Sequence, residues 1–425
     1  MNASQLKSKL QAGALSAYQH LYADIAAQTQ RYLDAIDAFC ELYGDQEDIR
    51  IFSVPGRSEL SGNHTDHNHG CVLAGAIDRD IIAIAAPTQD GQVRIKSQGY
   101  PEDVVSLSQI SDPSLFKPYT SQALLAGICN AFQIGGYNVG GFCAYTTTQV
   151  LKGSGISSSA AFEVQCGNVM NYLYNDGRVA NEEIAKMAQY AENVYFGKPC
   201  GLMDQMACAV GGFLSIDFQD PKNPVITPVA FSLADAGYKL CIVNTGGNHA
   251  DLNDDYASVP TEMRAVAHFF GQEVLRGLSE SDVVSSIPAL RTAVGDRAIM
   301  RALHFLRENA RVEKQVEALK AQDFPAFLEQ VIASGNSSFK YLQNVFTVKN
   351  VEEQGLSLAL AVTEGLLADK GCAWRVHGGG FAGTIQAFVK QEYADDYCAV
   401  MNSVFGDGAV MMLSVRPVGA TEITL

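Results

Sequence analysis

The sequence predicts an α+β protein that folds into two domains. Its 425 residues exceed the length of one ordinary domain. Apolar residues make up 47% and charged residues 18%, a composition that buries sizeable cores and excludes a disordered or collagen-like chain. Segments with strand and helix periodicity follow one another without strict βαβ alternation, which favours mixed sheets with separate helices.

Periodic apolar residues predict the elements of the first half. Leu6, Leu10 and Leu21 recur at helical spacing, so we expect residues 1–45 to be helical. The polar run Asp78–Asp80 is expected to interrupt the strands of Cys71–Ala86. The other predicted strands are 51–54, 93–96, 141–148 and 209–218, and the other predicted helices are 122–132, 160–173 and 181–195.

A turn-rich segment with two prolines, 220–224, predicts the break between the domains. We therefore expect an N-terminal domain of residues 1–220 and a C-terminal domain of residues 221–425. In the second domain the predicted strands are 239–244, 374–376, 384–389 and 411–415, and the predicted helices are 255–273, 296–318, 324–335 and 351–367.

The charge balance excludes broad classes of partner. Thirty Lys and Arg residues against 46 Asp and Glu residues give a net charge of −16. Such a chain repels a phosphate backbone, so we expect neither a nucleic-acid nor a membrane partner. Met1 is followed by no signal-peptide core, and no apolar run approaches the roughly 20 residues that span a bilayer. The ten cysteines contain no Cys-x-x-Cys pair, which favours a reducing, cytoplasmic location. The oligomeric state stays open, because the sequence shows no exposed seam.

A Gly/Ser-rich loop, Lys152–Ser159, joins a predicted strand to a predicted helix. Glycines allow close backbone approach to a ligand, and a helix N-terminus offers free N–H groups and partial positive charge. No Gly-Lys-Ser/Thr closes the loop, so it is not a Walker A motif. The pattern predicts a phosphate-binding loop with hydroxyls available to Mg²⁺, although a flexible loop with a serine cap fits equally well.

Two further glycine-containing segments carry polar chemistry. Segment 55–70 is predicted to be a loop and contains three histidines in six residues. Their spacing fits no zinc motif, so a sugar site is favoured over zinc, with a surface turn as the simplest alternative. Segment 375–384 carries four glycines between two strands, which implies close approach of a ligand or a neighbouring loop.

Two carboxylates complete the candidate set. Asp204 lies in an apolar run, where an unpaired charge is costly, so it requires a cation partner or a role as a helix cap. Glu192 lies near the end of a predicted helix.

Taken together, these segments resemble the galactokinase branch of the GHMP kinases. The family pattern Gly-Arg-Val-Asn-Leu-Ile-Gly-Glu-His-Thr-Asp-Tyr is similar to residues 56–67, and Gly-x-Gly-Leu-Ser-Ser-Ser-Ala is similar to 153–160. Cys-Gly-Ile-Met-Asp-Gln is similar to 200–205, and Arg-x-x-Gly-x-Gly-Phe-Gly-Gly is similar to 375–383. Four matches in the family order are far more specific than any single motif.

The resemblance implies the two-domain GHMP kinase fold, with the active site in the cleft between the domains. It implies a sugar kinase that uses ATP and Mg²⁺ to phosphorylate the anomeric hydroxyl of galactose. By position it also implies a role for each matching residue: Asp204 as catalytic base with Arg57 as its cation; Asn63, His64, Asp66, Gly201 and Tyr256 as sugar contacts; Ser97, Gly153, Ser154, Gly155, Ile156, Ser157, Ser158 and Ser159 as nucleotide contacts; Ser159 and Glu192 as Mg²⁺ ligands.

Two sugar-segment positions differ from the galactokinase pattern. Asn63 stands in place of Glu and His67 in place of Tyr, which is similar to plant galacturonokinases. Loss of the negative charge would admit an anionic sugar, so the alternative is a kinase for galacturonate or another galactose-configured sugar. Asn still donates and accepts hydrogen bonds, which keeps galactose as the first expectation. A non-catalytic sugar sensor is the remaining alternative, and the intact Asp204 and Glu192 argue against it.

Overall fold

The computed structural model describes residues 1–22, 24–150, 155–198, 200–247 and 252–425. The strands in these residues are β1 (Arg50–Ser61), β2 (Cys71–Thr88), β3 (Gln92–Ser97), β4 (Glu102–Ser106), β5 (Gly141–Thr148), β6 (Phe213–Asp217), β7 (Val225–Val229), β8 (Tyr238–Asn244), β9 (Ala373–His377), β10 (Thr384–Lys390), β11 (Val410–Leu413) and β12 (Thr421–Glu422). The α-helices are α1 (Ala3–Gln11), α2 (Ile25–Tyr43), α3 (Ser121–Ile134), α4 (Ser158–Tyr174), α5 (Asn181–Tyr190), α6 (Met203–Val210), α7 (Asn253–Phe269), α8 (Glu280–Ser285), α9 (Ile287–Ala293), α10 (Asp296–Lys320), α11 (Phe324–Ser337), α12 (Gly355–Leu367) and α13 (Gln391–Phe405).

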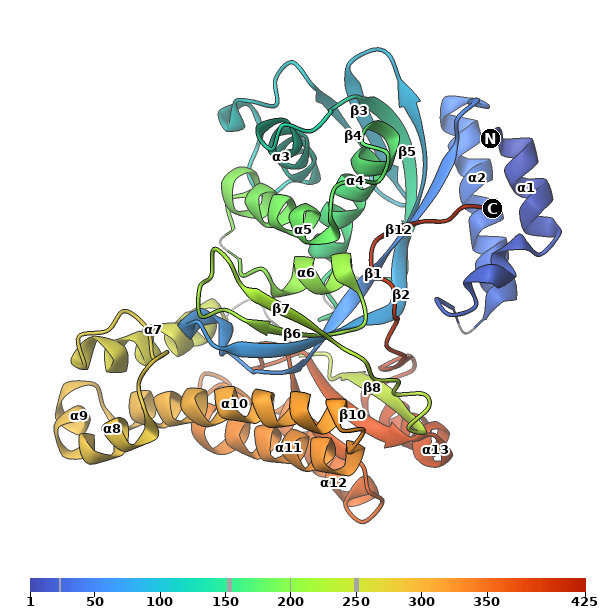
Figure 1. The fold of residues 1–425 in the computed structure, drawn as a ribbon. Helices are drawn as coiled ribbons and strands as arrows, with labels where there is room; N and C mark the ends of the chain where they lie inside the picture. Colours follow the sequence, from blue (N-terminus) through green and yellow to red (C-terminus); the bar gives the residue numbers. More distant parts are fainter. Residues whose placement is uncertain (23, 151–154, 199, 248–251) are drawn as a thin grey trace.

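Two sheets organise the described part of the chain, and helices cover both (Figure 1). The larger sheet has the order β12-β1-β2-β5-β3-β4, and the β6–β7 hairpin is attached to β2. Its pairs are antiparallel except for β3 and β5, which run parallel. The smaller sheet has the order β11-β8-β10-β9 and is antiparallel. This mixture of sheets and helices confirms the α+β prediction.

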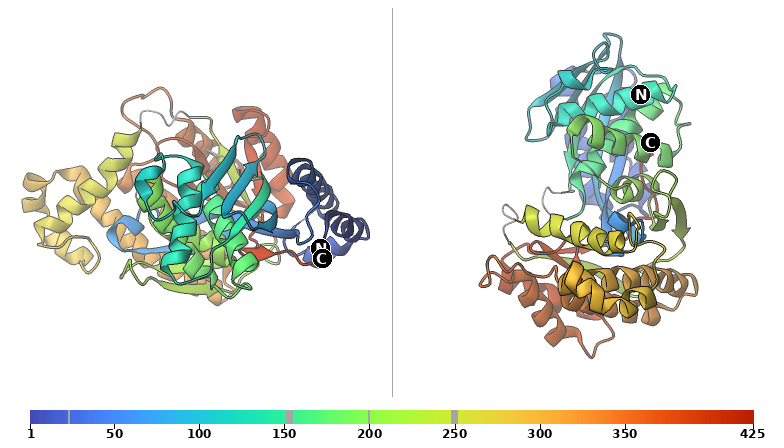
Figure 2. Two further views of the ribbon diagram at one scale, coloured as in Figure 1. Left: turned by 90° about the horizontal axis from the view of Figure 1, so that it is seen from above. Right: turned by 90° about the vertical axis from the view of Figure 1, so that its left-hand side faces the viewer.

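The central strand β2 is apolar on both of its faces because helices cover both. Ile81, Ala83 and Ala85 face the core beneath α3 to α6, whereas Ile82 and Ile84 alternate with them and pack against α1 and α2. Successive side chains of a strand point to opposite faces, so a strand buried on both sides has a continuous apolar sequence. The views in Figures 1 and 2 show α1 and α2 on one side of the sheet and α3 to α6 on the other.

The predicted interruption of β2 at Asp78–Asp80 is wrong, since the strand is continuous from Cys71 to Thr88. Asp80 is fully buried and is neutralised by Arg31 at 2.6 Å and Arg416 at 3.3 Å. Two cations from remote parts of the chain thus allow a carboxylate to sit inside the sheet.

The predicted loop at 55–70 begins later than expected, because β1 extends from Arg50 to Ser61. Its pairing with β2 shifts register between Pro55 and Arg57 and again between Glu59 and Ser61. Such irregularities re-aim side chains beside a site. The predicted strand 209–218 is also partly wrong: Met203–Val210 is helical, and only Phe213–Asp217 is a strand.

The second half places its long helices beneath the larger sheet. Helices α10 and α11 lie side by side (Figure 1), and α11 packs against β9 of the smaller sheet. The predicted boundary at 220 falls in the turn of the β6–β7 hairpin, so β7 lies after it and still belongs to the larger sheet. The C-terminal segment returns to pair β12 with β1. The division into two domains therefore stays a prediction. Among the described helices, none is long and apolar enough to cross a membrane.

Candidate active site

The strand β1 and the helix α6 bring Arg57 and Asp204 together as a two-pronged ion pair. Arg57 Nε donates to Asp204 Oδ1 at 2.7 Å, and Arg57 Nη2 donates to Oδ2 at 2.8 Å. Burial raises the pKa of a carboxyl, but the charge and hydrogen bonds of Arg57 outweigh burial, and the pKa of Asp204 is lowered. Asp204 lies in the first turn of α6, where the helix dipole also favours a negative charge. The cation partner that its burial required is thus Arg57.

The end of the Gly/Ser-rich loop lies directly against this pair. Arg57 Nη1 donates to the Gly155 carbonyl at 2.6 Å, and the backbone N–H of Arg57 donates to Ile156 O at 3.1 Å. Ser157 precedes α4 with a left-handed φ of 60°, and its hydroxyl donates to Asp204 Oδ2 instead of capping the helix. A non-glycine residue in this strained conformation is common at functional sites. Ser158 and Ser159 form the first turn of α4, whereas Gly153 and Ser154 lie outside the described residues.

A buried polar cluster adjoins the N-terminus of α4. Glu192 belongs to a π-helical turn, Ala191–Phe196, and π-helical turns are frequent at functional sites. Lys198 Nζ lies 3.3 Å from Glu192 Oε1, and Gln205 Nε2 donates to both Glu192 (2.8 Å) and Glu163 (3.1 Å). Burial raises the pKa of Glu163 well above its usual value, and the nearby Glu192 raises it further. One Glu163 oxygen is buried with no hydrogen-bond partner among the described residues.

This cluster fits a divalent cation in its donor chemistry. The hydroxyl of Ser159 and the carboxylate of Glu192 are hard oxygen donors of the kind that Mg²⁺ prefers. Glu163 and Glu192 lie close together beside a single lysine; burial and the charge of Glu192 raise the pKa of Glu163, and a bound cation would lower it. Among the described residues, no group of three or more His, Cys, Asp or Glu side chains is arranged to hold a metal ion.

The predicted sugar contacts Asp66 and Gly201 line one cavity of about 280 Å³. A Cβ atom placed on Gly201 would lie 3.2 Å from Asp66 Oδ2, so the absence of a side chain keeps this carboxylate accessible. His67 and His69 of the same segment also line the cavity, and His67 lies 3.8 Å from Asp66. The cavity therefore gathers polar side chains from two segments that are far apart in the sequence.

The other predicted sugar contacts bind the glycine loop that follows β9. His64 Nε2 lies 2.9 Å from the Gly379 carbonyl, and burial lowers the pKa of His64 to about 4, so its ring is neutral near pH 7. Tyr256 donates its hydroxyl to Gly380 O at 3.0 Å, and its ring would overlap a Cβ atom at Gly379. Close approach of the Tyr256 ring, from α7, thus explains the glycine at position 379.

The side chains of Asn63 and Ser97 both form hydrogen bonds with other protein groups. Asn63 is fully buried, and both ends of its amide bond protein groups. Ser97 ends β3, and its hydroxyl accepts a hydrogen bond from Thr146 at 2.9 Å. Within the described residues, no hydrogen bond joins Ser97 to the Gly/Ser-rich loop.

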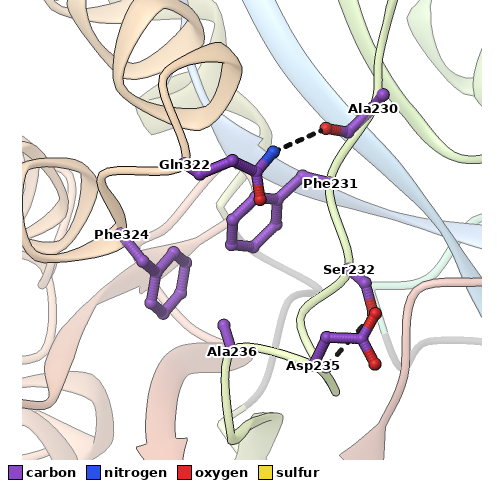
Figure 3. Close-up of a pocket in the computed structure, with 7 residues that line it drawn as sticks. All are labelled: Ala230, Phe231, Ser232, Asp235, Ala236, Gln322 and Phe324. Atoms are coloured by element: carbon purple, nitrogen blue, oxygen red, sulfur yellow. Dashed lines mark hydrogen bonds between the residues drawn. The ribbon is translucent and has the colours of Figure 1, made fainter.

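A separate cavity of about 410 Å³ lies beside the connection from β7 to β8 (Figure 3). The rings of Phe231 and Phe324 stack at 5.1 Å, and Gln322 donates to Ala230 O at 3.1 Å. Among the described residues that line it, Asp235 alone is ionisable, so the cavity lacks the paired charges found around Asp204.

Comparison with known proteins identifies the family. The galactokinase galactose-binding signature matches residues 37–87, and the GHMP kinase N-terminal domain matches 123–212. A galactokinase of Streptomyces coelicolor is 31% identical, with 87% of this chain and 92% of the relative covered. The chain belongs to the galactokinase family. A galactokinase of Actinobacillus pleuropneumoniae is 30% identical, with 84% and 89% covered.

Solved structures agree with the family fold. Galactokinase of Lactococcus lactis, complexed with galactose, is 23% identical with a TM-score of 0.75, and 91% of this chain and 98% of that chain are covered. Mevalonate kinase of Methanococcus jannaschii is 16% identical with a TM-score of 0.61, and 87% and 99% are covered. The predicted GHMP kinase fold is thereby confirmed, and the chain is a sugar kinase by family.

Sequence reasoning missed several residues that hold the site together. Lys198 and Gln205 bind Glu192, and Arg375 binds Glu59 at 2.9 Å. Gln205 follows Asp204 directly, so its place beside the site was visible. Glu59 follows Arg57 by two residues on one strand, and strand alternation would have placed both on the same face.

Proposed function

We infer that the protein transfers the γ-phosphoryl group of ATP to the anomeric hydroxyl of galactose, which yields galactose 1-phosphate and ADP. The observation that carries this inference is the Arg57–Asp204 ion pair, held against the end of a Gly/Ser-rich loop in a chain of the galactokinase family.

The chemistry requires a base, a phosphate site and correct orientation. Asp204 is ionised near neutral pH because its pKa is lowered, so it accepts the proton of the anomeric hydroxyl. The hydroxyl oxygen bonds the γ-phosphorus while the bond from that phosphorus to the bridging oxygen breaks, and ADP leaves. Arg57 orients Asp204, and the free N–H groups at the start of α4 face the phosphate charge.

We assign the remaining contacts by position in the family pattern. His64, Asp66, Gly201 and Tyr256 are proposed sugar contacts, and 153–159 with Ser97 are proposed nucleotide contacts. Ser159 and Glu192 would hold Mg²⁺, which when bound neutralises charge on the phosphate oxygens. The partners are thus ATP and a small sugar, and ten free cysteines support a cytoplasmic location.

Neither alternative function, a galacturonate kinase or a non-catalytic sugar sensor, is favoured. The galacturonate alternative rested on Asn63 as the group that meets the sugar, yet its amide is buried and bonded to protein. The curated relatives are galactokinases. A non-catalytic sensor would have no need of an ion-paired Asp204 at the phosphate loop.

The test is identification of the product. Purified protein with Mg²⁺-ATP and galactose should release ADP and form a phosphate ester whose phosphorus NMR signal couples to the anomeric proton. Formation of the 6-phosphate, or ADP release that does not depend on galactose, would contradict the proposal.

A further inference from the structure

The amide of Asn63 has no capacity left for a ligand. Its Nδ2 group donates to Glu59 Oε1 at 3.1 Å and to the Gly378 carbonyl at 2.6 Å. Its Oδ1 atom accepts from Asn344 at 2.8 Å and from Ser338 at 3.3 Å. An amide has two N–H donors and two acceptor positions, so every one is used. Recognition of the sugar at this end of the site must come from another group.

Glu59 has the properties that such a group requires. Arg375 and Asn63 both donate to the same oxygen, Oε1, which fixes the carboxylate in place. No described residue donates to Oε2, this oxygen is not among the buried atoms that lack a partner, and a tenth of the Glu59 side chain stays exposed. Burial raises the pKa of Glu59, whereas the charge of Arg375 and the hydrogen bond from Asn63 lower it and so favour the carboxylate form.

The strand geometry places Glu59 at a useful distance from the reacting end. Arg57 and Glu59 lie in continuous register with Ala76 and Ala74 of β2, so their side chains leave the same face of β1. Two residues of a strand span about 7 Å, which is comparable to the distance across a pyranose with its substituents. If the anomeric hydroxyl lies at Asp204, we expect the far edge of the sugar ring to lie beside Glu59.

We propose that Glu59 is the specificity-determining carboxylate of the sugar site: its free oxygen accepts a hydrogen bond from a hydroxyl at the far edge of the ring and repels an anionic sugar there. The proposal rests on the galactose kinase activity inferred above. A carboxylate fixed by Arg375 accepts a neutral hydroxyl without rearrangement, whereas a sugar carboxylate would place two negative charges together.

The family pattern adds an independent prediction about this pair. Its segment has Asn where this chain has Glu59 and Glu where this chain has Asn63, so the amide and the carboxylate have exchanged positions. The two side chains are hydrogen-bonded to each other here, at 3.1 Å. Because the two side chains are in direct contact, exchanging their positions leaves one carboxylate and one amide in the site, and substitutions of the two residues should be coupled. The two substitutions are therefore expected to compensate one another.

A double-mutant cycle with kinetics on galactose, galacturonate and ATP tests the proposal. Glu59→Asn should raise KM for galactose roughly 10- to 100-fold, the equivalent of one hydrogen bond to a charged group, and should reduce discrimination against galacturonate. Asn63→Glu should also weaken galactose binding, because two carboxylates then adjoin. The double variant Glu59→Asn/Asn63→Glu should return KM for galactose to within roughly fivefold of the original.

Controls distinguish sugar recognition by Glu59 from a purely structural role of this residue, and failure of this proposal from failure of the proposed function. KM for ATP should stay constant in Glu59→Gln, which keeps the shape of the side chain. Glu313→Gln, at an exposed position of α10, should leave KM for both galactose and ATP unchanged. An unchanged galactose KM in Glu59→Gln, or additive losses in the double variant, would overturn the proposal. If the wild-type protein does not phosphorylate galactose, the proposed function fails instead, and calorimetric binding of galactose to the same four proteins still decides the role of Glu59.

Discussion

The phosphate end and the sugar end of the candidate site are built differently. At the phosphate end, Arg57, Ser157 and Asp204 match the family pattern, and Arg57 and Ser157 both donate to Asp204. At the sugar end, Asn63 and His67 depart from the pattern, and the segment is held by the glycine loop 378–383 through His64 and Asn63. The comparison teaches that reaction chemistry constrains the first region, whereas the second tolerates exchanges that preserve its internal hydrogen bonds.

The largest effect is expected at the phosphate end, from Asp204→Asn. Loss of the base should lower kcat roughly 10²- to 10⁴-fold, because an amide does not accept the hydroxyl proton. Steady-state ADP release measures this loss. Asp235→Asn, in the exposed cavity of Figure 3, is the matched control and should keep full activity. Retention of kcat in Asp204→Asn would show that this carboxylate is not the base.

At the sugar end, Gly380→Ala should destabilise the fold by roughly 2–4 kcal/mol. Its φ of +81° disfavours a side chain, and a Cβ atom there would lie 2.0 Å from Asn344 O. Gly378→Ala is the control, because Gly378 has a φ of +67° with no atom within 4 Å, so it reports the backbone strain alone. Urea unfolding of both variants gives the difference between their free energies of unfolding. Equal losses of stability would mean that Asn344 moves away from the added Cβ atom at little cost.

These two ends also show how far the sequence could predict the site. The pairing of Asp204 with a cation was predictable from its place in an apolar run, and the resemblance pointed to Arg57 across 147 positions. The partners of Asn63 were not predictable, because Asn344 and Ser338 belong to a segment without any motif and reach it only through the fold. The continuity of β2 was missed for the same reason, since Arg31 and Arg416 come from opposite ends of the chain.

Mild acid should destabilise the fold through three histidines buried around the site. Burial lowers the pKa of His377 to about 3 and of His64 to about 4, and it also lowers the pKa of His304. Below about pH 6.5 the unfolded chain binds protons at these histidines and the folded protein does not, so stability falls as pH falls. Each histidine contributes up to about 1.4 kcal/mol per pH unit until its folded pKa is reached.

Urea midpoints at pH 7.5, 6.5 and 5.5 measure this loss. Asp204 and Asp80 have lowered pKa values, so their stabilisation is lost only below the usual carboxyl range, in a separate window. A midpoint that stays constant from pH 7.5 to 5.5 would show that these histidines are accessible to protons in the folded state.

The smallest effect is expected from Ser157→Ala at the phosphate end. Its hydroxyl donates to Asp204 Oδ2, and loss of one hydrogen bond to a charged group should lower kcat/KM roughly tenfold. The pKa of Asp204 should also rise, so the acid limb of the pH–rate profile should move to higher pH. Ser403→Ala, at an exposed position of α13, is the control. An acid limb at the same pH in Ser157→Ala and the wild-type protein would show that the Ser157 hydroxyl does not stabilise ionised Asp204.

The most direct test of the whole account is competition between galactose and galacturonate in one reaction with the wild-type protein. The ratio of the two anomeric phosphates formed from equal sugar concentrations gives the ratio of kcat/KM values directly. We predict that galactose 1-phosphate is formed at least roughly tenfold faster, because the carboxylate of Glu59 accepts a hydroxyl and repels an acid. Faster formation of galacturonate 1-phosphate would contradict the account.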